Sequence, residues 1–132
     1  MPAAAVEPPW LVACLCAAWC RTCDDYRAVL AAAEQSHPDV RFAWIDIEDH
    51  ADALDDPDGA AEDIESFPTL LLSLGDAPYF CGTVLPHAGV LERLLEQART
   101  RALSPLKDPA SQHLARVVGA LVRQGLPALR VA

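Results

Sequence analysis

The stretch Trp19-Cys20-Arg21-Thr22-Cys23 decides the fold of this chain, because it places two thiols three positions apart between two patterned segments. The segment before it, Trp10 to Cys16, is apolar throughout and predicts a buried strand. The segment after it, starting at Asp24, has the apolar spacing of a helix. The cysteine pair is therefore expected at the corner between a strand and a helix.

This corner favours sulfur chemistry at Cys20. The first amides of a helix have no partners within the helix, and the helix dipole has its positive end there, so a thiolate is stabilised relative to a thiol. We therefore expect Cys20 to be the attacking thiol, with the charge of Arg21 acting in the same direction. Cys23, one turn into the helix, is expected to be more enclosed. In the expected cycle Cys20 forms a mixed disulfide with a substrate, and Cys23 then attacks Cys20 and releases the reduced substrate.

Two more cysteines, Cys14 and Cys16, precede the pair and suggest zinc as an alternative. A strand inside a sheet fixes its side chains in place, which argues against a tetrahedral site shared with the start of a helix, so no metal is expected. Cys14 and Cys16 share one face of their strand and are expected to be buried apolar residues. A sharper hypothesis places Cys14 beneath Cys23 as a third thiol.

A second mark of the same architecture is Phe67-Pro68-Thr69, which heads the strand-like run Thr69 to Leu74. Proline can begin a strand but does not fit inside a central one. A WCxxC motif after a buried strand, together with this Pro-Thr, resembles the thioredoxin family over about Trp10 to Ala98. The resemblance implies the thioredoxin fold, an α/β fold with a central mixed four-stranded sheet flanked by helices.

The resemblance also implies a substrate-binding face beside the catalytic pair. Pro68 would be in the cis form against the pair, and Phe67 would pair with substrate as a short added strand. Trp19 would form part of the same face. Gly82 matches the family glycine that lets the backbone approach the pair closely.

The chain departs from the usual thioredoxin pattern in three ways. Arg21 and Thr22 replace the Gly-Pro between the cysteines, so the resemblance does not fix the reduction potential. Cys14 and Trp44 stand where thioredoxins usually have a buried aspartate and a lysine. The usual proton route to the inner cysteine is therefore not expected here.

Further patterns complete the predicted sheet. Residues 40–47 read as a second strand, parallel to the first because a long helical crossover joins them. The run from Thr69 is expected to form a hairpin with residues 78–81. Pro86 is expected to open a helix with an apolar stripe.

The end of the chain predicts an added amphipathic helix that begins at Asp108 and Pro109. Full-length thioredoxins have a strand and a helix before the central strand, and the first nine residues here are too few for both. We therefore expect the last helix to cover the sheet face that this leaves bare; the alternative is a dimer contact. The predicted organisation is a thioredoxin-like domain over residues 1–103 and a helical extension packed on it over residues 104–132.

Composition limits the setting of the protein. The chain has 132 residues, 52% of them hydrophobic, which is enough for one domain with a core. A net charge of −9 argues against nucleic acid as a partner. Neither a membrane span nor a secretory signal is expected, because no apolar run is long enough and the first residues are proline-rich without a basic region. Five cysteines cannot all pair within one chain, and a reducing cytoplasm fits this usage best.

The sequence therefore predicts a cytoplasmic thiol–disulfide oxidoreductase, an enzyme that exchanges a Cys20–Cys23 dithiol or disulfide with protein substrates. No bound cofactor is expected, since electrons would come from a reductase or a small thiol. A monomer or a weak dimer is expected. The alternative is a non-catalytic interaction module with the same fold, which binds a protein partner through the acidic run Asp46 to Glu65 and the last helix.

Overall fold

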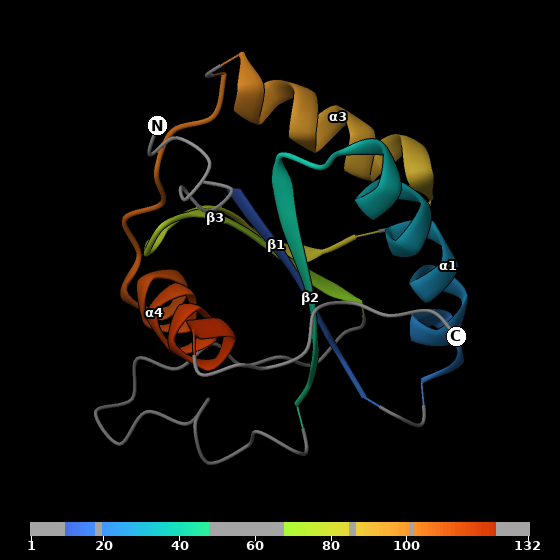
Figure 1. Cartoon of the computed structure of the whole chain (residues 1–132). Coiled ribbons are helices and arrows are strands. Elements are labelled where there is room, and N and C mark those ends of the chain that lie inside the picture. The colour runs from blue at the N-terminus through green and yellow to red at the C-terminus, as the bar shows by residue number, and fades with distance from the viewer. Residues whose placement is uncertain (1–9, 18–19, 48–67, 85–86, 101, 124–132) are drawn as a thin grey trace.

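A computed structural model (Figure 1) describes residues 10–17, 20–47, 68–84, 87–100 and 102–123. Four strands form one mixed sheet in the order β2-β1-β3-β4, which confirms the predicted α/β fold. The elements in chain order are β1 (Trp10–Cys16), α1 (Arg21–Ser36), β2 (Val40–Asp46), β3 (Thr69–Leu74), β4 (Ala77–Thr83), α3 (Ala88–Arg99) and α4 (Pro109–Arg123).

Strand β1 lies inside the sheet and is buried on both faces. It runs parallel to β2, to which α1 connects it, and antiparallel to β3. Because side chains alternate along a strand, β1 supplies two separate cores. One core receives Val12, Cys14 and Cys16, and the other receives Leu11, Ala13 and Leu15.

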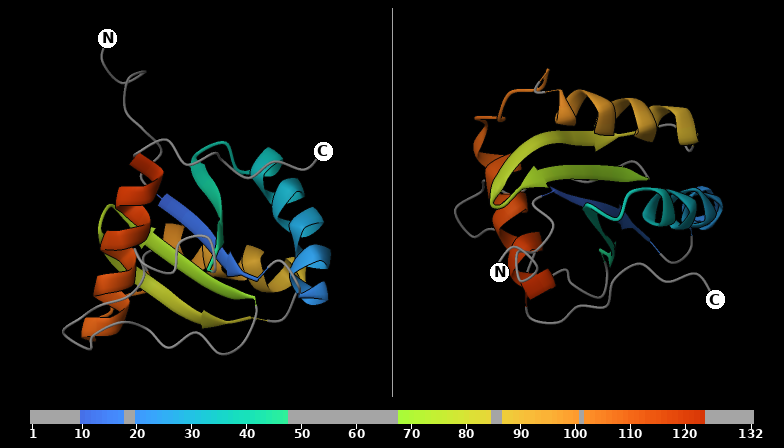
Figure 2. Two further views of the ribbon diagram at one scale, coloured as in Figure 1. Left: turned by 90° about the horizontal axis from the view of Figure 1, so that it is seen from below. Right: turned by 45° about the horizontal axis from the view of Figure 1, so that its top comes forward.

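Helices cover both faces of the sheet. Figures 1 and 2 show α1 and α3 on one face and α4 on the other. The first core lies under α1 and α3 and contains Tyr26, Leu30, Leu91 and Leu95 beside the cysteines of β1. The cysteine-bearing corner is therefore built on the α1–α3 side of the sheet.

Helix α4 packs on the opposite face. Asp108 caps it, because Asp108 Oδ2 accepts a 3.0 Å hydrogen bond from the Ser111 amide, as the sequence predicted. Leu114 and Val118 pack on the second core of β1. At Gly119 an added Cβ would lie only 3.1 Å from Asp76 Oδ1, so glycine lets the helix approach the turn between β3 and β4 closely. Helix α4 thus covers the sheet face that α1 and α3 leave open. The division into a domain over residues 1–103 and an extension over residues 104–132 stays a prediction.

The second half of the sheet is the predicted hairpin. Gly75 has φ +61° in the turn from β3 to β4, a left-handed conformation that favours glycine. Pro78 sits on the edge strand β4, where a missing amide is tolerated, and its carbonyl accepts a 2.7 Å hydrogen bond from Leu106.

Helix α3 begins later than the sequence indicated. His87 is its N-cap, with extended angles of φ −118° and ψ 137°, so the helix starts at Ala88 rather than at Pro86. A residue with extended angles does not belong to the helix, and the apolar stripe in the sequence does not by itself determine the residue at which the helix begins. Pro86 itself lies outside the described residues.

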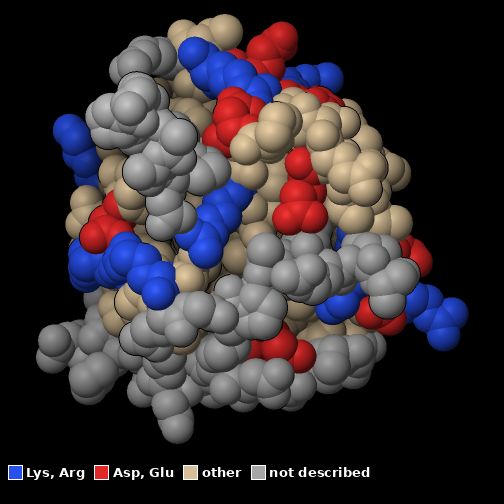
Figure 3. Space-filling model, in the orientation of Figure 1, with Lys and Arg blue, Asp and Glu red and all other residues tan. Residues whose placement is uncertain are grey.

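Charges of both signs are interspersed on the face that Figure 3 shows, and the described residues there do not gather into a patch of one sign. None of the helices in the described ranges is long and apolar enough to cross a membrane.

Candidate active site

The candidate site lies where β1 ends and α1 begins. Cys16 is the last residue of β1, and Cys20 is the N-cap of α1 with no hydrogen bond from its side chain to the helix. The Cys20 amide donates to the Ala17 carbonyl at 3.0 Å, which closes a tight turn between the two elements. This turn holds the Cys20 thiol at the positive end of a 16-residue helix.

A disulfide joins Cys16 to Cys23, with their Cα atoms 5.9 Å apart. Cys23 is therefore bonded to the end of β1 rather than to Cys20, the partner that the sequence suggested. Cys20 keeps a free thiol, is only partly buried, and packs against the core that contains Cys23. In this state the site has one accessible thiol beside a buried disulfide.

Cys14 lies behind the disulfide. Its Sγ is 3.2 Å from Cys16 Sγ, and its side chain is fully buried. Burial raises the pKa of the Cys14 thiol far above its usual value, and the nearby Arg27 opposes this only in part. Cys14 therefore keeps its proton and is the hydrogen-bond donor to Cys16, whose sulfur has no hydrogen in the disulfide.

Two of the positions at which the chain departs from the thioredoxin pattern, Cys14 and Trp44, are neighbours. Cys14 pairs with Trp44 across β1 and β2. The Arg27 guanidinium of α1 lies 4.3 Å from the centre of the Trp44 ring, within the range of a cation–π contact. The thiol and the indole that replace the family's usual aspartate and lysine are thus paired, and a guanidinium lies against the indole.

The predicted substrate face is described only in part. Thr69 pairs with Leu15, so Pro68, one residue earlier on this antiparallel strand, lies level with Cys16. Pro68 is buried, and its carbonyl accepts a 3.1 Å hydrogen bond from Val84, which extends the β3–β4 pairing to this end of the sheet. Trp19 and Phe67 lie outside the described residues.

Gly82 lies one strand further out. It pairs with Leu70, which itself pairs with Cys14. Among the described residues, only the Phe80 ring would come within 4 Å of a Cβ added at Gly82, at 3.7 Å. That is an ordinary contact, so the described surroundings leave room for a side chain at this position.

Sequence reasoning missed Cys16 as the partner of Cys23. The available signal was the alternation that puts Cys14 and Cys16 on one face, but both were expected to be buried apolar residues, and the sharper hypothesis placed Cys14 rather than Cys16 beneath Cys23. Cys16 is the closer of the two because it ends β1, immediately before the turn into α1. Within the described ranges no group of three or more His, Cys, Asp or Glu side chains is arranged to hold a metal ion.

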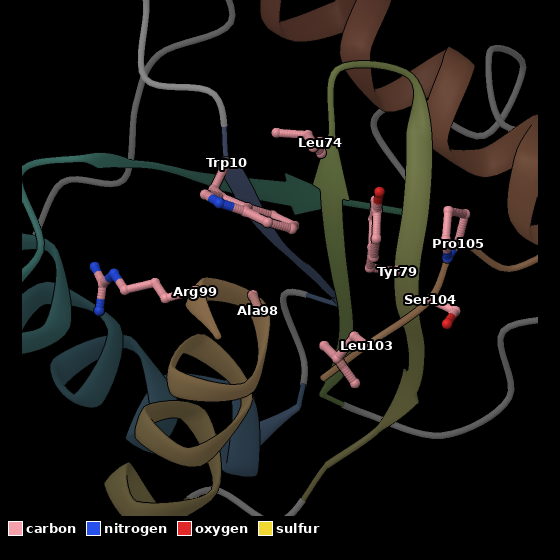
Figure 4. Close-up of a pocket in the computed structure, with 8 residues that line it drawn as sticks. All are labelled: Trp10, Leu74, Tyr79, Ala98, Arg99, Leu103, Ser104 and Pro105. Atoms are coloured by element: carbon pink, nitrogen blue, oxygen red, sulfur yellow. The ribbon is translucent and has the colours of Figure 1, made fainter. Parts of the chain in front are cut away.

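A separate cavity lies at the other end of the sheet. It has a volume of about 280 Å³, and Trp10, the first residue of β1, is one of its walls (Figure 4). The Trp10 and Tyr79 rings meet edge to face there, with centroids 5.1 Å apart. Because Cys16 is at the opposite end of β1, this cavity does not belong to the cysteine site.

The strand order, the helices on both faces and the cysteine-bearing corner define a thioredoxin-fold protein. Solved structures similar to this chain include thioredoxins. Mitochondrial thioredoxin 3 from Saccharomyces cerevisiae superposes with a TM-score of 0.55 at 23% identity, covering 69% of this chain and 80% of that one. Thioredoxin f2 from Chlamydomonas reinhardtii superposes with a TM-score of 0.55 at 19% identity, covering 70% of this chain and 82% of that one. The thioredoxin of Fasciola hepatica superposes with a TM-score of 0.54 at 17% identity, covering 69% of this chain and 82% of that one.

These likenesses show the fold. No protein-family model matches the sequence, and no curated protein matches it either.

Proposed function

We propose that the protein is a thiol–disulfide oxidoreductase in which Cys20 is the nucleophile and Cys23 the resolving thiol. One observation carries the proposal: a partly buried free thiol at the N-terminal end of α1 packs beside a disulfide that already contains Cys23. The thiolate is the attacking species in such exchange, and Cys20 is the thiol of this corner that a substrate disulfide can reach.

The reaction uses the cysteines in sequence. A donor dithiol, or two small thiols, first reduces the disulfide of Cys23, which leaves Cys16, Cys20 and Cys23 all as thiols. The Cys20 thiolate then attacks a substrate disulfide and forms a mixed disulfide, with one substrate sulfur leaving as a thiol. Cys23 attacks Cys20 Sγ, which forms the Cys20–Cys23 bond and releases the second substrate sulfur. No bound cofactor enters these steps, because the electrons come from the donor.

Substrate would dock beside Pro68, at the end of the sheet that carries Cys16. Phe67 and Trp19 would complete this face, with the Phe67 backbone pairing to an extended substrate segment. Protein disulfides are the substrate class that fits such docking, and a reductase or a small thiol is the donor. A reducing compartment such as the cytoplasm suits this direction of electron flow.

Insulin reduction with dithiothreitol as donor tests the proposal. Wild type should accelerate precipitation of the insulin B chain, and Cys20→Ser should lower the rate to that of dithiothreitol alone, because the other cysteines of the corner, Cys14, Cys16 and Cys23, are buried. Cys81→Ser is the matched control, since Cys81 packs against the core on the opposite face of the sheet, and it should stay within about twofold of wild type. Wild type with no activity above the donor alone would instead favour the interaction module.

A further inference from the structure

We propose that Cys16 is a third redox-active residue of this site, which takes Cys23 into a buried disulfide and exchanges it with Cys20. The proposal rests on the oxidoreductase function proposed above. The oxidised protein then exists as two isomers, one with a Cys16–Cys23 bond and one with a Cys20–Cys23 bond.

Cys23 has a potential partner on each side. Cys16 is 1% exposed and already bonded to it, and Cys23 is itself fully buried. Cys20 is three residues away, at the first turn of the same helix, where residues i and i+3 lie on one side. Cys20 also packs against the core that holds the disulfide.

The exchange of Cys23 between Cys16 and Cys20 needs no outside oxidant or reductant. The Cys20 thiol loses its proton, and the thiolate attacks Cys23 Sγ. The Cys20–Cys23 bond forms as the Cys16–Cys23 bond breaks, and Cys16 leaves as a thiolate that takes up one proton. The number of disulfides is unchanged.

Cys14 is a positioning residue for this step. Its Sγ lies 3.2 Å from Cys16 Sγ, and its proton is retained in the buried core. It therefore offers an S–H donor to the negative charge that develops on the leaving sulfur of Cys16. Strand β1 holds both sulfurs on one face, so this contact is built into the sheet.

The buried isomer changes what the site can do. While Cys23 is bonded to Cys16, a mixed disulfide on Cys20 has no resolving thiol and persists. Once the donor reduces the Cys16–Cys23 bond, the Cys23 thiol can resolve it. After exchange, by contrast, Cys20 is bonded to Cys23 and the free thiol is on Cys16, so the partner of Cys23 decides whether the oxidised site still presents the Cys20 thiol to a substrate.

Peptide mapping of the full-length protein after oxidation with diamide tests the pairing directly. Free thiols are labelled with N-ethylmaleimide in the folded state, and the chain is then cut with trypsin and chymotrypsin. Cleavage after Trp19 and after Arg21 places Cys16, Cys20 and Cys23 on three different peptides. We expect Cys23 linked to Cys16 and maleimide on Cys20. A Cys23 linked only to Cys20, or linked to Cys14, overturns the proposal.

Two matched variants test the exchange. Cys16→Ala and Cys81→Ala each remove one sulfur, and Cys81 packs on the opposite face of the sheet. After oxidation, Cys16→Ala should lose at least tenfold of the maleimide label on Cys20, because Cys23 then bonds Cys20, whereas Cys81→Ala should still label there. Equal labelling of Cys20 in wild type and in Cys16→Ala overturns the exchange. Circular dichroism checks that each variant is folded. The peptide map of wild type tests the pairing even if neither variant folds.

Insulin reduction separates failure of this proposal from failure of the proposed function. An active protein whose Cys23 is linked only to Cys20 overturns the role of Cys16 and leaves the oxidoreductase standing. An inactive protein whose Cys23 is linked to Cys16 overturns the proposed oxidoreductase function, and the Cys16–Cys23 bond is then a structural disulfide only.

Discussion

Burial separates the sulfurs of the corner into different roles. Cys14, Cys16 and Cys23 are almost completely buried in one core, whereas Cys20 is partly exposed at the start of α1. An incoming disulfide therefore meets Cys20 first. The buried sulfurs meet a protein substrate only through Cys20, so access sets the order of the steps on the substrate.

The Tyr26 hydroxyl is the second unusual group in this core. The side chain is fully buried, and no described residue gives its oxygen a hydrogen bond. Burial raises the pKa of Tyr26, with Cys14 acting in the same direction, so the hydroxyl stays neutral. A buried polar group without a partner costs about 1–3 kcal/mol of stability.

Tyr26→Phe should therefore raise the free energy of unfolding by about 1 kcal/mol, because it removes the unpaired oxygen and keeps the ring. Urea denaturation of the reduced protein measures the change. Tyr79→Phe is the matched control, since Tyr79 is only partly buried, and it should stay within about 0.5 kcal/mol of wild type. A loss of stability in Tyr26→Phe would show that the hydroxyl has a partner after all.

At the corner, the sequence predicted the strand, the helix and the exposed position of Cys20, because each follows from local pattern. The bond between Cys16 and Cys23 could not be predicted in this way. Which of two sulfurs on one strand face reaches a helix depends on how the helix packs on the sheet, and cysteine spacing alone does not determine pairing. For the same reason the contact of Arg27 with Trp44 was not anticipated.

At the scale of elements, polar contacts join the end of α1 to α3. Arg99 donates to both carboxylate oxygens of Asp39, at 2.7 and 2.9 Å, and to Nδ1 of His37 at 2.9 Å. Since Nδ1 accepts this bond, the proton of the neutral ring is on Nε2, which donates to Glu92 at 2.7 Å. The network ties the two helices that cover the cysteine core.

The bond from Arg99 lowers the pKa of Asp39 below its ordinary value of 3.8. A carboxyl with a lowered folded-state pKa stabilises the fold above the unfolded-state value, and the stabilisation is lost as pH falls through the folded-state value. Asp39→Asn should therefore be less stable than wild type at pH 5, by less than about 1 kcal/mol because the pair is exposed, and the difference should shrink as pH falls from 5 toward 2.5.

Thermal unfolding at both pH values measures this effect. Glu96→Gln removes another exposed carboxylate from α3 and should stay within about 0.5 kcal/mol of wild type at pH 5. A difference between Asp39→Asn and wild type that stays constant down to pH 2.5 would contradict the ion-pair explanation.

The Asp108 cap of α4 gives a second prediction for a single element. Asp108→Ala removes the acceptor of the Ser111 amide and should lower the free energy of unfolding by about 1 kcal/mol. Asp108→Asn should keep most of the stability, because asparagine caps helices about as well as aspartate. Urea denaturation compares the three proteins, and an equal loss in both variants would mean that charge rather than capping is responsible.

Most elements could be predicted because their signals are local. Alternation in a strand and the i, i+3, i+4 spacing in a helix reflect burial on a regular backbone, and Asp108-Pro109 marks a helix start by its own chemistry. The start of α3 was misplaced because Pro86 satisfies the preference for a first helical residue, although His87 is still extended. Trp19 and Phe67 remain predictions, since neither is among the described residues.

At the scale of the whole molecule, the sheet needs a helix layer on each face. β1 is apolar on both sides, so a bare face would expose Leu11, Ala13 and Leu15 to water. α1 and α3 cover the cysteine side, and only α4 covers the other side among the described residues (Figure 2). The stability of the cysteine site therefore depends on a helix that does not touch it.

Leu114→Ala tests this dependence. Leu114 is 2% exposed and packs on the second core, so the truncation should lower the free energy of unfolding by about 2–4 kcal/mol through lost burial and the cavity left behind. Urea denaturation measures the loss, and Arg116→Ala, on the exposed side of α4, is the control that should change it by less than about 0.5 kcal/mol. If α4 instead served mainly as a dimer contact, Leu114→Ala would shift a concentration-dependent association and leave the unfolding of the monomer unchanged.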